Sequence, residues 1–192
     1  MKRFFATLAA CFMFVSSAQA IDSRVESAVQ WAIAIANDQT HGYSQGAENP
    51  PYTGSRDGVD YDCSSLVYHA LDHAGFNIVE NWQQKNPKFW SRYNGQQKVG
   101  DADTVWQDLQ PCGGWVKYSW YDVKDNLQRG DILANPHHVA FYIGDGKTVE
   151  ARGVNNPKGG SYATGDQGGE IDFYSAQNRG WTEVYRYTGE EK

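Results

Sequence analysis

The segment from His138 to Ala151 restricts the fold of this chain more than any other. Apolar residues alternate with other residues from His138 to Gly144, which is typical of a β-strand with one buried face. Asp145-Gly146 is a strong turn signal, and an apolar segment returns after it and ends at Ala151. The sequence therefore predicts an antiparallel hairpin with a histidine at the head of its first strand.

A cysteine begins the second informative segment, 75 positions before that histidine. Apolar residues at helical spacing predict a helix from Asp62 to Ala74, and Gly75 supplies its stop. Cys63 falls in the middle of the apolar stripe, so we expect it to face the protein. Backbone amides at a helix start favour the thiolate, and a neighbouring imidazole such as that of His138 completes a nucleophile. This pair predicts a cysteine hydrolase.

A nucleophile and its base need a third group that orients the base, and Glu150 is the candidate. A plain two-residue turn would place Glu150 on the opposite face of the sheet from His138. One extra residue would set it opposite Ala140, beside the histidine, where the small Ala140 leaves room for substrate. We therefore predict a bulged or three-residue turn with Gly146 at positive φ. An unbulged two-residue turn would remove Glu150 from the site.

The other histidines are weaker candidates. His137 falls on the opposite side of the strand start, so alternation favours His138 as the base. His69 and His73 have an i, i+4 spacing that can hold zinc, but they lie on the solvent flank of their helix and lack the glutamate of a metalloprotease motif. We expect no metal site.

The remaining elements are predicted from hydrophobic periodicity and from the Gly- and Pro-rich turns that separate them. We expect an irregular, aromatic-rich segment over 77–100 and a Gly/Asn-rich loop over 153–169. Helices are expected over 22–37 and 103–109, and strands over 132–134 and 181–187. No internal repeat or attached second module is found in the sequence, so a single domain is expected.

The first twenty residues read as a signal peptide. A basic start precedes the apolar run from Phe4 to Val15, and a small-x-small cleavage site ends at Ala20. A lipid attached at Cys11 is the alternative, but the apolar run continues past that residue. Cleavage after Ala20 would leave one domain over residues 21–192, periplasmic or secreted, with no membrane anchor expected.

Charge and cysteine content limit the partners. The first twenty residues carry two basic and no acidic groups, so their removal changes the formal net charge from −6 to −8. Nucleic acid and anionic membranes are therefore not expected partners. Cys63 and Cys112 remain in the mature chain, and a disulfide between them is the alternative to catalysis, because it would remove the nucleophile.

The motifs resemble those of a known family. Asp-Cys-Ser-Ser-Leu-Val from Asp62, an Arg-Gly-Asp-Ile-Leu segment from Arg129, and the stretch from His138 are similar to the NlpC/P60 papain-like cysteine peptidases. The resemblance covers roughly residues 25–152, and the segment from His41 to Gly46 is similar to phage-type peptidoglycan amidohydrolases. The resemblance implies a papain-like α+β fold, in which the nucleophile helix packs against an antiparallel sheet. It also implies cleavage of amide bonds in cell-wall stem peptides without a cofactor.

The resemblance also assigns roles to individual residues. Glu150 stands where the family more often has histidine, and Ser65 replaces a usual glycine, which leaves the substrate detail open. The implied roles are Cys63 as nucleophile, His138 as base, Glu150 as orienter, Tyr43 as oxyanion donor, and Asp62 and Ser64 as substrate-binding residues.

Two functional alternatives to the hydrolase remain. The same architecture could transfer an acyl group to an amine, or the chain could be a non-catalytic cell-wall binding protein with Cys63 in a disulfide. The sequence does not determine which bond is cleaved or the oligomeric state. It also does not determine whether the target is the cell's own wall or that of a competitor. If the chain were a toxin against competitors, an immunity or inhibitor protein is a candidate partner.

Overall fold

The helices and strands alternate irregularly along the chain. The structure is a computed structural model that describes residues 21–44, 59–85, 100–152, 165, 168–177 and 179–189. Within these ranges the elements are α1 (Ser23–Ala36), α2 (Cys63–His73), α3 (Ile78–Lys85), α5 (Val105–Leu109), a 3₁₀ turn (Gln110–Cys112), β1 (Trp115–Ser119), α6 (Trp120–Val123), β2 (Ile132–Asn135), β3 (His138–Gly144), β4 (Lys147–Ala151), β5 (Ile171–Ser175) and β6 (Glu183–Tyr187).

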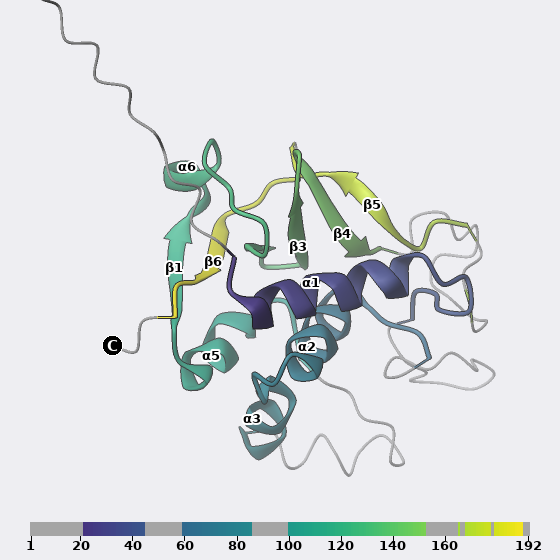
Figure 1. Cartoon of the computed structure of the whole chain (residues 1–192), viewed down its shortest axis with the longest axis horizontal. Helices are drawn as coiled ribbons and strands as arrows, with labels where there is room; N and C mark the ends of the chain where they lie inside the picture. The colour runs from purple at the N-terminus through teal and green to yellow at the C-terminus, as the bar shows by residue number, and fades with distance from the viewer. Residues whose placement is uncertain are drawn as a thin grey trace, which may run out of the picture.

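The strands form one antiparallel sheet in the order β1-β6-β2-β3-β4-β5. Helix α2 packs against β3 and β4, and α1 packs against α2 and the β4–β5 end of the sheet (Figure 1). The main hydrophobic core fills the space between these helices and the sheet, and a second cluster lies around Leu133, Ala140 and Trp181. The predicted α+β fold, with the cysteine helix packed on an antiparallel sheet, is confirmed.

The two predicted long helices begin and end within a residue of their expected bounds, because their capping residues are explicit in the sequence. Asp22 caps α1 by accepting from the Arg24 backbone N–H at 2.8 Å. Helix α2 begins after Asp62 and is followed by Ala74 and by Gly75, which has a φ of 82°. The left-handed backbone at Gly75 explains why the helix stops there.

Five of these elements were not predicted, namely α3, the 3₁₀ turn, β1, α6 and β5. The segment expected to be irregular contains α3, whose Trp82 is buried in the core. Strands β1 and β5 form the two edges of the sheet, and each contains a single buried residue among half-buried and exposed ones. Residues 86–99 and most of the predicted loop over 153–169 lie outside the described residues.

None of the described helices has the length and apolar character needed to cross a membrane. The predicted signal peptide lies outside the described residues.

Candidate active site

The turn between β3 and β4 carries the irregularity on which the site depends. Phe141 pairs with Val149, whereas Gly144 pairs with Lys147, so β3 contains one more residue than β4 near the turn. Gly146 has a φ of 69°. The prediction of a bulged turn with Gly146 at positive φ is therefore confirmed.

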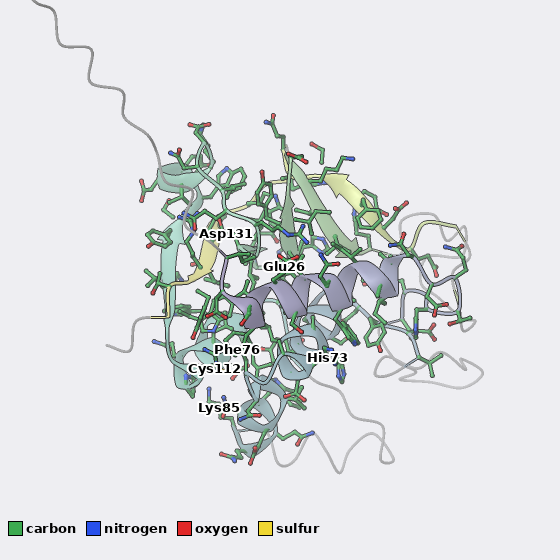
Figure 2. The ribbon with its side chains drawn as sticks, in the orientation of Figure 1. Glu26, His73, Phe76, Lys85, Cys112 and Asp131 are labelled. Atoms are coloured by element: carbon green, nitrogen blue, oxygen red, sulfur yellow. The ribbon has the colours of Figure 1, made fainter. Side chains whose placement is uncertain are left out.

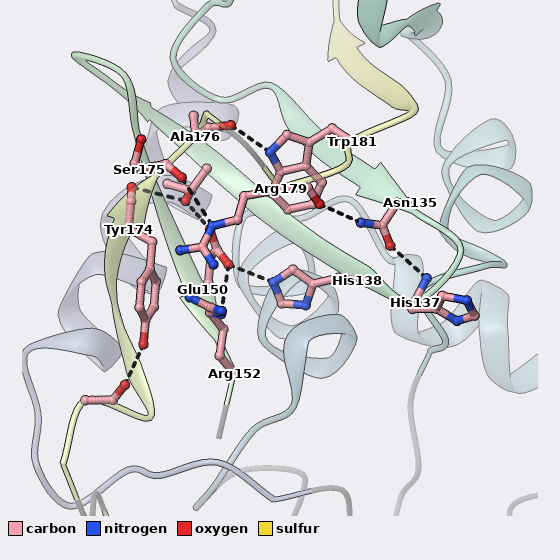
Figure 3. Close-up of polar contacts among 12 residues, drawn as sticks. Asn135, His137, His138, Glu150, Arg152, Tyr174, Ser175, Ala176, Arg179 and Trp181 are labelled. Atoms are coloured by element: carbon pink, nitrogen blue, oxygen red, sulfur yellow. Dashed lines mark hydrogen bonds and ion pairs between the residues drawn. The ribbon is translucent and has the colours of Figure 1, made fainter. Parts of the chain in front are cut away.

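The bulge places Glu150 beside His138. The imidazole Nε2 of His138 lies 2.8 Å from Glu150 Oε2 (Figure 3). Because Nε2 is occupied by this hydrogen bond, Nδ1 is the ring nitrogen that can exchange a proton with a reacting group. His137 is exposed, and its backbone N–H donates to Asn135 Oδ1 at 2.9 Å. The pairing with Glu150 favours His138 over His137 as the base.

Glu150 is fully buried and surrounded by donors and positive charge. Thr148 Oγ1 donates to Glu150 Oε1. The Nε atoms of Arg152 and Arg179 lie 3.6 Å and 4.0 Å from the two carboxylate oxygens. Both guanidinium groups stack over the ring of Tyr174, at 4.4 Å and 5.1 Å from its centroid. Arg152 therefore belongs to a charge cluster around Glu150.

These neighbours determine the ionisation of Glu150. Burial raises the pKa of its carboxyl group, but the hydrogen bonds from His138 and Thr148 and the charges of His138 and Arg179 outweigh burial. The net result is a pKa below the usual range of glutamate. Glu150 is therefore an anionic acceptor at neutral pH, as required of a group that orients an imidazole and stabilises its protonated form.

Trp181 covers the imidazole of His138. The two rings stack with centroids 5.6 Å apart and an interplanar angle of 17° (Figure 3). The indole Nε1 donates to the Ala176 carbonyl at 2.9 Å, which fixes the orientation of the ring. The sequence predicted only a strand near Trp181 and missed this contact. Ala140 packs with Trp181 and is 1% exposed, so the expectation that it leaves room for substrate is wrong.

Cys63 is the first residue of α2, at the end where the backbone amides point outward. Its N-cap Asp62 forms a capping box with Ser65: Asp62 Oδ1 accepts from the Ser65 backbone N–H at 2.8 Å, and Ser65 Oγ accepts from the Asp62 backbone N–H at 2.9 Å. Ser64 Oγ donates to Asp62 Oδ1 at 2.9 Å. Cys63 is half-buried against the core, as its place on the apolar stripe predicts. The two predicted substrate-binding residues thus fix the start of the cysteine helix.

Tyr43 is held next to the residues that lead into this helix. It forms a parallel bridge with Tyr61, two positions before Cys63. The Tyr43 backbone N–H donates to Glu170 Oε2 at 3.1 Å. Asp60 Oδ1 accepts from the Gly42 backbone N–H at 3.0 Å. Two buried carboxylates therefore position the segment that carries the predicted oxyanion donor.

The sequence profile of the NlpC/P60 family matches residues 41–187, which include the Tyr43 segment, the cysteine helix and the complete sheet. The chain belongs to the NlpC/P60 family. A comparison with curated proteins finds no match.

The solved structures that align with this chain include proteins from mycobacteria and from Trichomonas vaginalis. This NlpC/P60 chain aligns with a hypothetical invasion protein of Mycobacterium tuberculosis at 20% identity and a TM-score of 0.44, over 89% of this chain and 68% of the other. A P60 domain from an M. avium subspecies paratuberculosis antigen aligns at 16% identity and a TM-score of 0.44, over 86% and 98%. The peptidoglycan hydrolase RipB of M. tuberculosis aligns at 19% identity and a TM-score of 0.43, over 87% and 68%.

Cys112 lies apart from the site in this NlpC/P60 chain. It is located on the helical side with Lys85 (Figure 2), where Asn81 Nδ2 lies 3.3 Å from its Sγ. Burial raises the pKa of its thiol to about 11, so the thiol is protonated at neutral pH. In the described part of the chain no disulfide joins Cys63 and Cys112, so the disulfide alternative is wrong.

Neither His69 nor His73 belongs to a group of metal ligands. The ring of His69 packs on Tyr61 and that of His73 on Trp31. Across the described ranges, His, Cys, Asp and Glu side chains do not gather in threes or more around a common point.

The lowered pKa of Glu150 predicts a specific loss of stability in acid. Because its folded pKa lies below the reference value of 4.5, Glu150 stabilises the fold above that value, and this contribution is lost as pH falls through the folded pKa. The Glu150→Gln variant lacks this titration. We therefore expect the free energy of unfolding to fall less steeply below pH 4.5 in the variant than in the parent, as measured by urea unfolding at several pH values. An equal pH dependence of the free energy of unfolding in the two proteins would contradict the lowered pKa of Glu150.

Proposed function

We propose that this chain is an exported peptidoglycan hydrolase that cleaves an amide bond in a cell-wall stem peptide with Cys63 as nucleophile. The observation that carries the proposal is the hydrogen bond between His138 and the buried, anionic Glu150, on the strand against which the cysteine helix packs. A base held by a carboxylate is the arrangement that nucleophilic hydrolases use. Membership of the NlpC/P60 family and the similar fold of RipB are in keeping with this activity.

In the proposed reaction, Nδ1 of His138 removes the thiol proton of Cys63. The thiolate attacks the amide carbonyl carbon, and the resulting oxyanion accepts hydrogen bonds from the Cys63 backbone N–H and the Tyr43 hydroxyl. Protonated His138 then donates its proton to the leaving amine, the C–N bond breaks and a thioester remains. His138 next takes a proton from water, which attacks the thioester, and the thiol and a carboxylic acid are released.

Four further residues support the proposed reaction. Glu150 stabilises the protonated imidazole and holds the ring by the 2.8 Å hydrogen bond to Nε2. Trp181 excludes water from one face of the same ring, which strengthens the ion pair in the acylation step. Asp62 and Ser64 flank the nucleophile, and we propose that they also bind polar groups of the stem peptide at the start of α2.

Export is part of the proposal and rests on the basic and apolar character of residues 1–20. Removal of this segment would release the domain into the periplasm or the medium, where the wall is accessible. An immunity or inhibitor protein would be a partner only if the target wall belongs to a competitor.

Mass spectrometry of muropeptides tests the proposed activity. Purified peptidoglycan is incubated with residues 21–192, and we expect soluble fragments with a new carboxylate and a new amine, which together differ from the substrate by one water. Products in which an added amine has replaced water would instead indicate the acyl- or amidotransferase. A wall that remains uncut under conditions in which the protein is folded would contradict the proposal.

A further inference from the structure

We propose that a cavity beside Trp181 binds an N-acetylated sugar of the wall glycan. The inference rests on the proposed function, because it identifies a further part of the same substrate. The cavity has a volume of about 400 Å³ and is lined by α6, by the β3–β4 turn and by the segment between β5 and β6. Figure 1 shows α6 and the turn at the same end of the sheet. This volume is within the range of small-ligand sites.

Aromatic side chains line part of the cavity, as they do in many sugar-binding sites. Trp120 and Tyr121 of α6 line it on one side, and Tyr121 is 75% exposed. Trp181 is 2% exposed and packs with the second hydrophobic cluster beneath. A sugar ring has an apolar C–H face that packs on such rings, whereas its hydroxyl and acetamido groups project from the edge and need polar partners.

The charges around the cavity favour an uncharged polar ligand. Lys124 Nζ lies 3.0 Å from Asp125 Oδ2, and both residues line the cavity. Arg179 also lines it, and its Nε lies 4.0 Å from the carboxylate of Glu150. Because both cations already have an acidic neighbour, a polyanion gains little electrostatic attraction. A wholly apolar ligand would desolvate these groups without replacing their hydrogen bonds to water.

The cavity is joined to the proposed active site by two of its lining residues. Trp181 stacks on His138, and Arg179 belongs to the charge cluster around Glu150 (Figure 3). In peptidoglycan the stem peptide is covalently attached to the glycan, so a sugar bound here holds its attached peptide near the base. Binding energy from a group remote from the reacting bond then contributes to positioning that bond.

Titration with N,N′-diacetylchitobiose tests the cavity directly. The Cys63→Ala protein excludes turnover, and binding is followed by calorimetry and by the NMR signals of the Trp120 and Trp181 indole N–H groups. We expect both indole signals to shift. In this background Tyr121→Ala should weaken binding about tenfold, because it removes one stacking ring. Tyr121→Phe keeps the ring and should retain binding.

Asp122→Ala is the matched control, because Asp122 is exposed on the same helix and does not line the cavity. It should bind the disaccharide as the parent does, and circular dichroism should show that every variant is folded. Absence of binding, or unchanged binding in Tyr121→Ala, would overturn the inference. Displacement of the disaccharide by a sugar-free stem peptide at the same indole signals would overturn it as well.

Kinetics separate this inference from the proposed function. With active protein, kcat/KM is compared between a stem peptide attached to its disaccharide and the same peptide alone, and we expect the ratio to fall in Tyr121→Ala. Hydrolysis of both substrates with no effect of the sugar would overturn the cavity assignment and leave the proposed hydrolase intact. Tyr121-dependent sugar binding without any hydrolysis would support the cavity and contradict the hydrolase.

Discussion

Replacement of Cys63 by alanine is expected to lower the rate of stem-peptide hydrolysis by at least about 10³-fold, because the proposed thioester cannot form without the thiol. The fold should persist. Cys63 is only half-buried at the first position of α2, and the capping box between Asp62 and Ser65 does not involve its side chain. Release of muropeptides measured by chromatography gives the rate, and thermal unfolding by circular dichroism gives the stability.

Cys112→Ala is the matched control for this substitution. The Cys112 thiol has a pKa raised to about 11 and lies among α3 and α5, so its removal should leave the hydrolysis rate within about twofold of the parent. Labelling with iodoacetamide at pH 7 supplies an independent readout, since Cys63 should react faster than Cys112. A Cys63→Ala protein that still digests peptidoglycan at the parent rate would refute Cys63 as the nucleophile.

Glu150→Gln is expected to reduce kcat by on the order of 10²- to 10⁴-fold with a much smaller change in KM. The carboxamide is uncharged, so it cannot stabilise the protonated His138 that forms in each half of the reaction. Glu150 is fully buried, and we expect no direct contact with substrate, which is why KM should change little. Initial rates over a range of muropeptide concentrations at pH 7 separate the two constants.

Asp172→Asn is the control for Glu150→Gln, because Asp172 is the direct partner of Glu150 in the β4–β5 register. Its Oδ1 accepts from the Phe173 backbone N–H at 2.7 Å, and an asparagine oxygen can accept the same bond. We expect its kcat to stay within about twofold of the parent. Parent-like turnover by Glu150→Gln would show that His138 acts without a carboxylate partner.

The elements predicted best from the sequence are those whose ends are determined by capping or turn residues next to them. Asp22 and Asp62 are side-chain caps, and Gly75 permits the left-handed backbone that ends α2. The register of the β3–β4 hairpin followed from one requirement, that Glu150 and His138 share a face, and the observed bulge meets it. Local rules were sufficient in these cases because each depends on residues close together in the chain.

Features that depend on distant contacts could not be predicted in this way. Helix α3 has only eight residues, and its Trp82 is buried in the core. The stacking of Trp181 on His138 joins the segment before β6 to the first residue of β3. The cluster of Arg152 and Arg179 over Tyr174 requires β4 and β5 to be paired first. Periodicity along the chain carries no information about such pairings, so they emerge only from the tertiary structure.

The bulged hairpin also implies an order of assembly. His138 and Glu150 are separated by eleven residues and a single turn, and hairpins of this kind close in about 1–10 μs. Helix α2 begins at Cys63, 75 positions before His138, and its docking on β3 is a non-local contact that forms more slowly. The pair of His138 and Glu150 therefore forms first, and the helix that begins at Cys63 docks last. Under the proposed function, a chain in which α2 has not yet docked would not hydrolyse peptidoglycan.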